Sequence, residues 1–417
     1  MAREYKDSGI EWIGQIPKEW KFGYLKNYYN FEKGKNSQLY TKDYIGTKRG
    51  KYPVFSGQTE NNGIMGLIDS YDYDVDECIF TTTVGAKVMT PKLLKGRFSL
   101  SQNCLIMRRK TSDVINSYIY YLLFPLFGYY KSLLPSHMQP SLRIEDLCTY
   151  SFFLPPMTIQ QKIADFLDKV CGEIDEMVAL QETMIEELKA YKQSVITEAV
   201  TKGLNPNVSM RESGIDWIGE IPEQWEQHQF RRIFEIKKII AGTLGYDVLS
   251  VTQNGIKVKD LTKNEGQIAQ DYSKYQLVDV DDYVMNHMDL LTGYVDCSKQ
   301  KGVTSPDYRV FRAIDKSKIS LAYYLRIFQT CYKEKIFYHL GQGVSGMGRW
   351  RLPADQLKLF VLPMPPLSEQ LQIASYLEAK CSEIDFLITL KQAKIEELKE
   401  YKKSVIYEYV TGKKEVY

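Results

Sequence analysis

The sequence is poor in several features that mark particular classes of protein. Its 54 Lys/Arg and 52 Asp/Glu residues leave a net charge of +2, so bulk basicity does not indicate a polyanion-binding protein. It has 4 His and 7 Cys residues and no C-x-x-C pair, which excludes the common zinc and redox motifs. The cysteines are expected to be buried thiols in a reducing compartment.

Long hydrophobic runs are missing as well. The first residues lack the apolar core of a signal peptide, and the longest apolar stretch, 118–130, is too short to span a bilayer. We therefore expect a cytoplasmic protein that does not enter a membrane.

What is present is ordinary globular material with an unusual number of tyrosines. The 417 residues are 44% hydrophobic and 25% charged, which is enough for roughly two to four domains with proper cores. The 31 tyrosines offer rigid apolar rings with a polar tip, which suit contact surfaces as well as cores.

The strongest signal is an internal repeat. SGIEWIGQIPKEW (8–20) recurs as SGIDWIGEIPEQW (213–225), with 9 of 13 positions identical. CGEIDEMVALQETMIEELKAYKQSVITEAVT (171–201) recurs as CSEIDFLITLKQAKIEELKEYKKSVIYEYVT (381–411), with 18 of 31 identical. The chain is therefore a duplication in which each copy joins a divergent body to a near-constant helix.

The constant helices show a heptad pattern over about four heptads, from about 173 to 201 and from about 383 to 411. Polar residues interrupt it at Gln181 and Lys192 and again at Lys391 and Lys402. The predicted coiled-coil seam consists of Ile174, Val178, Ile185, Leu188, Val195, Ile384, Ile388, Ile395, Leu398 and Val405. The two helices most simply pack against each other, which leaves outer faces for partners. We assign partner binding to Met177, Met184 and Tyr191. The alternative is that each helix packs only on its own domain.

The two bodies are predicted to be of mixed α and β structure, with strands outnumbering helices. β-rich runs occur at 77–89, 102–109 and 282–295, and helical patterns near 114–124 and 318–338. Residues 21–153 carry a net charge of +6 and residues 226–361 a net charge of +5, whereas the rest of the chain is acidic. Such asymmetry is what phosphate-binding bodies on an acidic scaffold would show.

The motifs that could indicate catalysis lack the neighbouring elements or residues that their chemistry requires. Gly341-Gln-Gly343-Val-Ser-Gly346 follows a helical pattern and not a strand, so it is not expected to bind a dinucleotide. The Pro-Pro pairs lack the polar and aromatic neighbours with which adenine methyltransferases hold a flipped base. Asp216 with Glu235-Ile-Lys237 has loose nuclease spacing only. We predict no catalytic residues and no metal site.

Taken together, these residues resemble the specificity subunit of type I restriction-modification systems over essentially the whole chain. The resemblance rests on the SGIEWIGQIP opening of each half, the Pro-Pro segment followed by QxxIA (from Gln160 and from Gln370), and the EID…IEELK…K.SVI.E helices. YPVFSGQTENNGIMG (52–66), SLSQNCLI (99–106), LSVTQNGI (249–256) and GVTSPDYRVF (302–311) add to it. Gln160-Gln161 stands where the family often has the Glu-Gln that Glu369-Gln370 keeps.

The resemblance implies an α+β fold, with two strand-rich target-recognition domains joined by two long helices in an antiparallel coiled coil. It implies target-recognition domains at 1–153 and 205–361 and conserved helical regions at 154–204 and 362–417. It also implies a non-catalytic DNA reader that binds a bipartite asymmetric site in double-stranded DNA and docks two modification methyltransferase subunits, with restriction translocase subunits joining them. S-adenosylmethionine, ATP and magnesium would belong to those partners, and this chain would need no cofactor.

Base readout needs side chains that can form paired hydrogen bonds to base edges in the major groove. On that ground the predicted DNA-binding residues are Gln58, Thr59, Lys87, Gln102, Asn103, Asn254, Asn286, His287, Lys301 and Arg309. Helices of ~29 residues would be roughly 43 Å long, which suggests half-sites on the order of a dozen base pairs apart. Two other functions stay open at this point: a self-contained site-specific DNA methyltransferase or nuclease, and a coiled-coil scaffold with two protein-binding domains.

Overall fold

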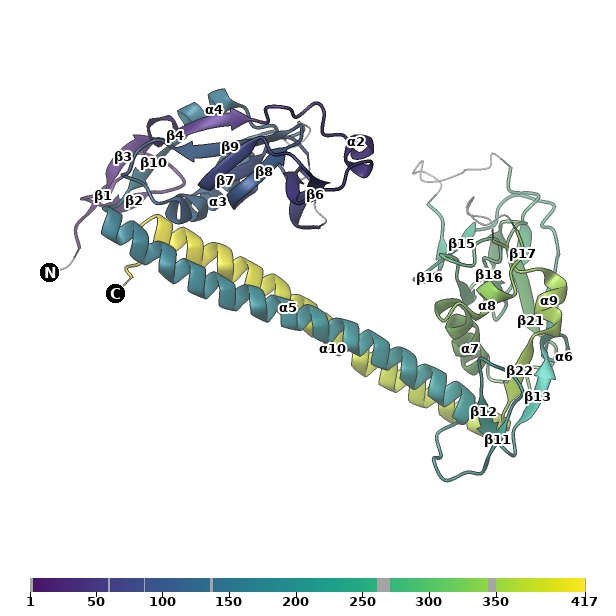
Figure 1. Cartoon of the computed structure of the whole chain (residues 1–417). Coiled ribbons are helices and arrows are strands. Elements are labelled where there is room, and N and C mark those ends of the chain that lie inside the picture. Colours follow the sequence, from purple (N-terminus) through teal and green to yellow (C-terminus); the bar gives the residue numbers. More distant parts are fainter. Residues whose placement is uncertain are drawn as a thin grey trace. The chain divides into compact units, whose positions relative to one another are not determined.

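The computed structural model of the chain describes residues 3–58, 61–85, 87–135, 138–260, 271–343 and 350–416. It divides into two compact units (Figure 1). The first consists of residues 1–182 and 392–417, and the second of residues 183–391. Each unit contains one body and a part of both long helices. Both chain ends belong to the first unit. The domain boundaries expected from the sequence remain a prediction.

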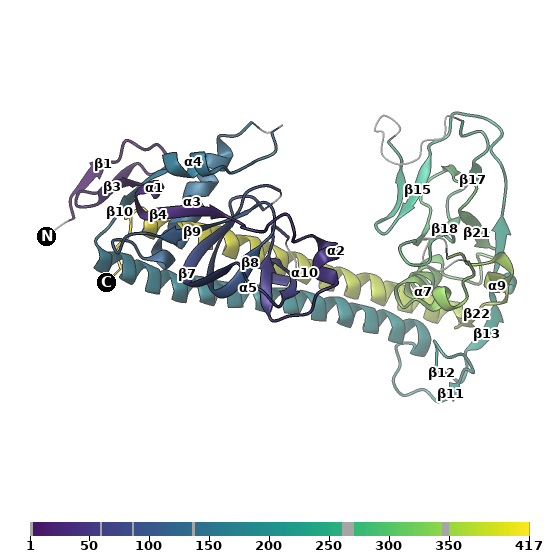
Figure 2. The same ribbon diagram turned by 45° about the horizontal axis from the view of Figure 1, so that its top comes forward.

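The first body is built on a six-stranded sheet in the order β4-β9-β7-β8-β5-β6, antiparallel throughout except for the β5–β8 pair. The helix α3 (Asn116–Ser132) packs against β7 and β8 and buries its apolar face there (Figures 1 and 2). The strands are β4 (Tyr29–Lys33), β5 (Tyr52–Phe55), β6 (Ile64–Ile68), β7 (Tyr73–Thr82), β8 (Pro91–Leu100) and β9 (Cys104–Arg109).

Smaller elements complete the first body. Two short antiparallel pairs, β1–β2 and β3–β10, hold the first residues of the chain and the segment before the Pro-Pro pair. These elements are β1 (Tyr5–Asp7), β2 (Gln15–Pro17), β3 (Lys21–Tyr24), α1 (Leu25–Tyr28), α2 (Lys42–Gly46), the 3-10 turn η1 (Asn61–Gly63), α4 (Ile144–Thr149) and β10 (Ser151–Leu154).

The second body has the same outline with a smaller sheet, in the order β14-β21-β18-β19. β11–β12 and β13–β22 take the places of β1–β2 and β3–β10. The strands are β11 (Met210–Glu212), β12 (Glu220–Pro222), β13 (Glu226–Gln229), β14 (Phe234–Lys237), β15 (Leu249–Thr252), β16 (Gly255–Val258), β17 (Gln276–Val278), β18 (Tyr283–Met285), β19 (Val295–Cys297), β20 (Gly302–Thr304), β21 (Arg309–Ala313) and β22 (Val361–Met364). The helices are α6 (Phe230–Ile233), α7 (Leu321–Lys333), α8 (Ile336–His339) and α9 (Ala354–Leu359).

Aromatic rings form the core of the second body. Phe234 of β14, Phe311 of β21 and Phe328 of α7 lie with ring centroids between 5.3 and 5.7 Å apart. The rings of Tyr283 and Phe311 stack at 5.0 Å. Edge-to-face packing of this kind adds to the stabilisation from burial alone.

The expected strands and helices of the bodies are only partly right in extent. The run at 77–89 is a strand only as far as Thr82, and the run at 282–295 is a strand only at its two ends. The predicted helices correspond to α3 and to α7 with α8. Turns therefore divide the apolar runs more often than their composition indicated.

The long helices begin directly after the Pro-Pro pairs. They are α5 (Met157–Lys202) and α10 (Leu367–Val410), with 46 and 44 residues. The expected length of ~29 residues was too short, and the spacing of a dozen base pairs derived from it loses its basis. Gly203 and Gly412 follow the helix ends with φ of 76° and 71°, a conformation that glycine adopts without strain.

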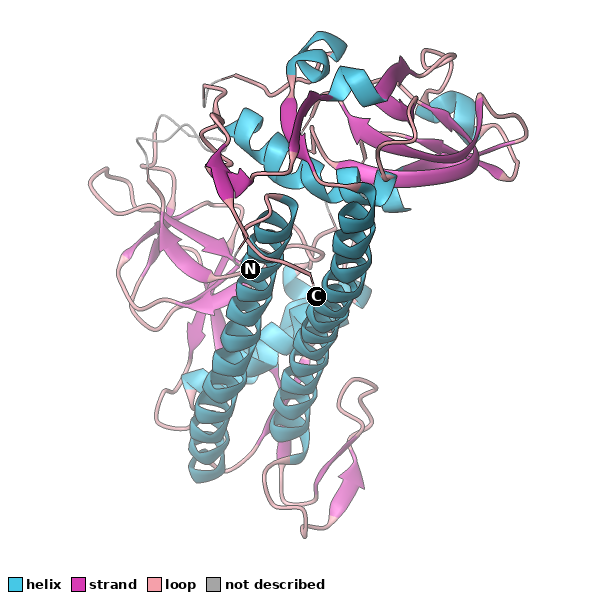
Figure 3. Ribbon diagram, turned by 90° about the vertical axis from the view of Figure 1, so that its left-hand side faces the viewer, coloured by secondary structure: helices cyan, strands magenta, loops and turns pink. Residues whose placement is uncertain are grey.

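In each unit the two helices run antiparallel (Figure 3). In the first unit, the ring of Phe166 lies 4.4 Å from that of Tyr409, and Lys402 pairs with Asp175 at 2.6 Å. In the second unit, Lys192 pairs with Asp385 at 2.6 Å. These two ion pairs occupy repeat-related positions, 210 residues apart in the sequence. The polar interruptions at Lys192 and Lys402 are therefore matched ion pairs.

The residues proposed for the seam lie toward the inside of the helix pair. Ile174, Ile185, Val195, Ile384, Ile395, Leu398 and Val405 are buried, and Val178, Leu188 and Ile388 are half-buried. No helix among the described residues is both long enough and apolar enough to cross a membrane.

A buried glutamine fastens the start of each long helix to its body. The amide of Gln160 accepts a hydrogen bond from the backbone N–H of Ile115 at 2.9 Å and donates to the carbonyls of Asp113 and Pro155. Gln370 makes the equivalent bonds to Ser320, Lys318 and Pro365. Both side chains are fully buried. The structure thus aligns Gln160 with Gln370, so Ile159, and not Gln160, stands opposite Glu369.

Candidate nucleic-acid interface

One end of the first body's sheet carries a hollow lined by polar side chains. Its lining comes from residues 37–42, the residues that follow β5, Met65 of β6, Val84 after β7, and the turn between β8 and β9. Its volume is about 410 Å³. Hairpin turns and loops at a sheet end are exposed and rigidly supported, which is where binding residues usually lie.

Three of the predicted DNA-binding residues line this hollow together, namely Gln58, Gln102 and Asn103. Gln102 and Asn103 are exposed at the β8–β9 turn, where Asn103 has a φ of 63°. The Nε2 group of Gln58 donates to the carbonyl of Ile64 at 2.6 Å, which fixes its amide at the rim. Sequence reasoning therefore chose side chains that the fold brings to one place.

The other two residues predicted in the first body do not join them. Lys87 is exposed, but it does not line the hollow, and its carbonyl accepts a hydrogen bond from Thr82. Thr59 lies outside the described residues.

A basic groove adjoins the polar hollow and shares Lys42, Gln58 and Met65 with it. Lys42, Lys48 and Arg49 line this groove, which has a volume of about 620 Å³. Within the described part of the chain, no carboxylate pairs with any of the three. Unpaired cations beside a polar hollow suit a phosphate backbone running next to base edges. The sequence analysis missed these three residues, although the run KDYIGTKRGK (42–51) could have drawn attention to them.

In the second body the predicted residues are spread over several places. Asn254 lies at the β15–β16 turn and is exposed, and Lys301 is exposed before β20. The Oδ1 atom of Asn286 accepts from the backbone N–H of Met288 at 3.3 Å, and its carbonyl accepts from the hydroxyl of Tyr332. The structure does not gather these side chains into one hollow.

Arg309 requires a correction. It is only 8% exposed, and its guanidinium donates to the carbonyl of Leu352 at 3.0 Å. Burial lowers its pKa to about 10. A side chain held in the interior cannot reach a base edge without leaving its partner, so we remove Arg309 from the proposed reading residues. Its place at the start of β21 was not visible from residue type alone.

His287 lies half-buried beside this arginine. Burial, together with the positive charges of Arg309 and Arg351, lowers the pKa of its imidazole to about 4. Its Nδ1 atom is buried and has no hydrogen-bond partner among the described residues. The imidazole is therefore neutral at pH 7.

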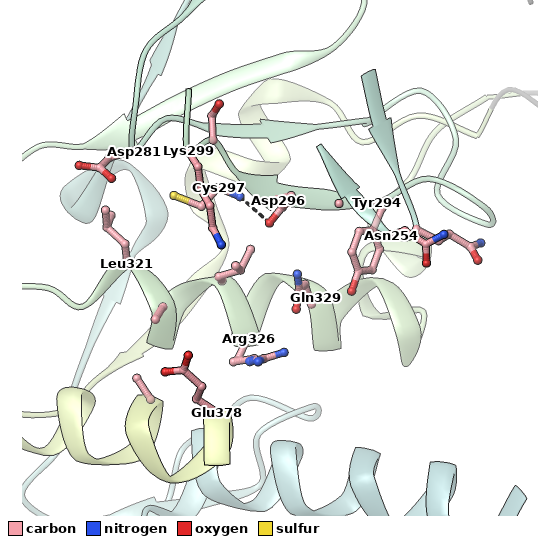
Figure 4. A pocket seen from close by; sticks show the side chains of 16 residues that line it. Asn254, Asp281, Tyr294, Asp296, Cys297, Lys299, Leu321, Arg326, Gln329 and Glu378 are labelled. Atoms are coloured by element: carbon pink, nitrogen blue, oxygen red, sulfur yellow. Dashed lines mark hydrogen bonds between the residues drawn. The ribbon is translucent and has the colours of Figure 1, made fainter. Parts of the chain in front are cut away.

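A second hollow lies in the second unit between α7, the β16–β19 region and α10 (Figure 4). Its volume is about 550 Å³, and Asn254 is the one predicted reader on its wall. The carboxylate of Asp296 accepts hydrogen bonds from the backbone N–H groups of Ile256 and Cys297. Arg326 of α7 and Glu378 of α10 line the side toward the long helix (Figure 4).

Two of the residues weighed for catalysis, Glu235 and Lys237, form structural ion pairs. Lys237 forms ion pairs with Asp282 at 2.6 Å and Asp279 at 2.7 Å, and Glu235 pairs with Arg312. The hydrogen bond from Lys237 holds the pKa of Asp279 below its usual range. No group of three or more His, Cys, Asp or Glu side chains in the described ranges is arranged to hold a metal ion. Residues 344–346 of the glycine motif lie outside the described residues.

Each long helix also carries exposed apolar side chains at repeat-related positions. On α5, Met177 and Tyr191 are 44% and 51% exposed. On α10, their counterparts Leu387 and Tyr401 are exposed as well. Met184 differs, because it is half-buried and its sulfur accepts a hydrogen bond from Nζ of Lys391 at 3.1 Å.

The repeat seen in the sequence is also found when the chain is compared with known families. The type I restriction modification DNA specificity domain matches residues 17–190 and, a second time, residues 222–400. The chain belongs to this family. Each specificity domain of the chain contains one body and most of one long helix, which confirms the resemblance noted in the sequence.

Proteins similar to this chain carry the names of type I specificity subunits. The chain is 23% identical over 419 residues to the type I restriction enzyme MjaVIII specificity subunit of Methanocaldococcus jannaschii, covering 96% of this chain and 94% of the relative. It is 28% identical over 159 residues to the MpnII specificity subunit of Mycoplasma pneumoniae, covering 37% and 47%. In five Mycoplasma pneumoniae relatives, the matched part spans only 40% to 62% of their length.

The fold is shared with a solved structure from work on the assembly and conformational transition of a type I restriction-modification system. The TM-score is 0.67 at 12% identity, covering 95% of this chain and 98% of the other. The predicted α+β class with strand-rich domains and long helices is thereby confirmed for this specificity-domain protein.

Proposed function

We propose that the chain is the sequence-specific DNA-recognition subunit of a type I restriction-modification complex. The observation that carries the proposal is that the same DNA specificity domain is matched twice, once over each body with its helix. Two divergent bodies on near-identical supports are suited to read two different half-sites. The recognised DNA is then a bipartite, asymmetric double-stranded site.

The electrostatics of the first body support this function. Lys42, Lys48 and Arg49 form a basic groove next to exposed amides that can meet base edges. Phosphate contacts supply affinity and fix the register on the duplex, whereas base contacts supply specificity. The arrangement of a basic groove beside a polar hollow provides both kinds of contact on one surface.

The long helices are proposed to dock two modification methyltransferase subunits. Met177 and Tyr191, with Leu387 and Tyr401 at the repeated positions, are exposed apolar side chains that a partner can cover. Met184 contributes less, because it already contacts Lys391. Restriction translocase subunits join through the methyltransferases. S-adenosylmethionine, ATP and magnesium serve those partners, and this chain contributes recognition and not catalysis.

A salt titration of DNA binding tests the proposal. The chain in complex with its methyltransferase should bind duplex DNA with a steep negative dependence of log K on log salt. Replacing Lys42, Lys48 and Arg49 together by glutamine should reduce that slope by about three, because each lost phosphate contact removes about one unit.

The matched control removes three positive charges elsewhere. Lys316, Lys318 and Lys358 each pair with an aspartate, so their replacement by glutamine should leave the slope nearly unchanged. If the complex does not bind DNA even at low salt, the proposed function is wrong.

A further inference from the structure

The polar hollow of the first body has a particular chemistry. Its wall includes four amide side chains, Gln38, Gln58, Gln102 and Asn103, and two apolar side chains, Met65 and Val84. All of them belong to the first unit, and the sheet brings them together from separate parts of the chain.

Three of the amides can form new contacts. Gln38, Gln102 and Asn103 are exposed, and within the described ranges their side-chain amides have no hydrogen-bond partner. The backbone around Gln102 and Asn103 is fixed, because the N–H of Thr83 donates to the carbonyl of Asn103 at 2.8 Å and the N–H of Ser101 donates to that of Phe55. Fixed turns with free amide ends are suited to directional hydrogen bonds.

The two apolar side chains provide a complementary surface. Val84 is 37% exposed, and Met65 is half-buried on the wall of the same hollow. An amide can form a bidentate pair with N6 and N7 of adenine, and an apolar side chain can contact the C5-methyl group of thymine. The hollow therefore offers groups for both members of an adenine–thymine pair.

Guanine-reading groups are scarce at the same place. Guanine is most often read by arginine or lysine through O6 and N7. Lys42 is the one cation among the described lining residues of the hollow, and it is shared with the basic groove. Arg97 and Arg108 of the same sheet are paired with Asp74 and Glu32.

We propose that Gln102 and Gln38 are specificity-determining residues of the first body. Their amides bond adenine in the major groove, and Val84 contacts the methyl group of the paired thymine. The inference rests on the proposed function and adds the residues that read an adenine–thymine pair of this half-site. Lys42 and the basic groove then hold the phosphate backbone beside these pairs.

Selection from a random duplex library tests this inference. The complex of the chain with its methyltransferase is incubated with duplexes of random sequence, and the bound fraction is sequenced. The motif should have two parts, and variants at Gln102 and Gln38 should alter adenine–thymine pairs in only one of them. Gln102→Ala should reduce the preference at one such pair about tenfold. Gln102→Arg should shift the preference at that pair toward guanine.

Two control variants show which part belongs to which body. Asn30→Ala replaces an exposed amide on β4 of the same sheet, away from the hollow, and should leave the motif unchanged. Asn254→Ala in the second body should affect only the other part of the motif. Circular dichroism melting of each variant shows whether it has folded like the parent chain.

The outcomes separate the inference from the proposed function. A bipartite motif in which Gln102 and Gln38 variants alter only guanine–cytosine pairs, or alter nothing, would overturn the inference and leave the function standing. Failure of the parent complex to enrich any duplex would overturn both.

Discussion

The indole Nε1 of Trp225 donates a hydrogen bond to Oε2 of Glu369 at 3.0 Å. The repeat-related Trp20 is equally buried, but its Nε1 has no partner in the described part of the chain, because Ile159 stands at the position of Glu369. The two copies thus share a tryptophan against the end of a long helix and differ in whether its polar atom is satisfied.

This difference predicts an asymmetry in stability. Glu369→Ile gives the second unit the arrangement of the first and leaves the indole N–H of Trp225 buried without an acceptor. We expect a loss of about 1–3 kcal/mol in the free energy of unfolding, measured by denaturant titration. Ile159→Glu is the reciprocal variant and should not destabilise the first unit by a comparable amount. Equal losses in both variants would contradict the role of the hydrogen bond.

A second prediction concerns the buried ion pair in the second body. The side chains of Lys237 and Asp282 are 3% and 4% exposed. Lys237→Met leaves the Asp282 carboxylate buried without its cation and should cost about 3–5 kcal/mol. Combining it with Asp282→Asn removes the uncompensated charge and should restore part of the loss. The midpoint of chemical unfolding measures both, and a double variant no more stable than Lys237→Met would argue against the pair.

The third prediction is a pH dependence from His287. Its imidazole has a pKa of about 4 in the folded chain against 6.5 as the ordinary value. Between pH 4 and 6.5 the imidazole is protonated in the unfolded chain but neutral in the folded chain. The free energy of unfolding is therefore highest above pH 6.5 and declines as the pH falls toward 4. His287→Gln should flatten the curve of unfolding free energy against pH in this window. His339→Gln, at an exposed position, is the matched control for replacing a histidine by glutamine in the same body. Parallel curves for the parent and His287→Gln would contradict the burial of the ring.

The fourth prediction concerns the long helices as a spacer between half-sites. Inserting four residues after Glu187 lengthens α5 by roughly 6 Å. If the coil survives the stutter, the unread gap in the methylated motif should lengthen while both half-sites stay the same. The same four residues inserted after Asn205, in the exposed segment beyond the helix, should not change the gap. Long-read methylation mapping compares the two variants. Active complexes that keep the gap and change half-site bases would show that the helices do not set the spacing.

The duplication, the presence of long helices and the family could be predicted from residue order, because these depend on repeated and periodic residues. The full length of the helices could not be predicted, because they extend beyond the repeated heptads. Heptad spacing predicts which side of a helix is apolar from residue order alone, and Ile174 and Ile384 are buried accordingly. Residue type also nominated Gln58, Gln102 and Asn103, since few other side chains can read a base edge.

Which polar residues share a surface, in contrast, depends on the folded chain. Gln38 and Gln102 are far apart in the chain, and they line the same hollow because the sheet order places their segments at one end of the sheet. Arg309 and Lys237 looked equally available in the sequence, yet one is buried against Leu352 and the other against Asp282. Burial and pairing depend on contacts between distant segments, and residue order does not encode those contacts in any local pattern.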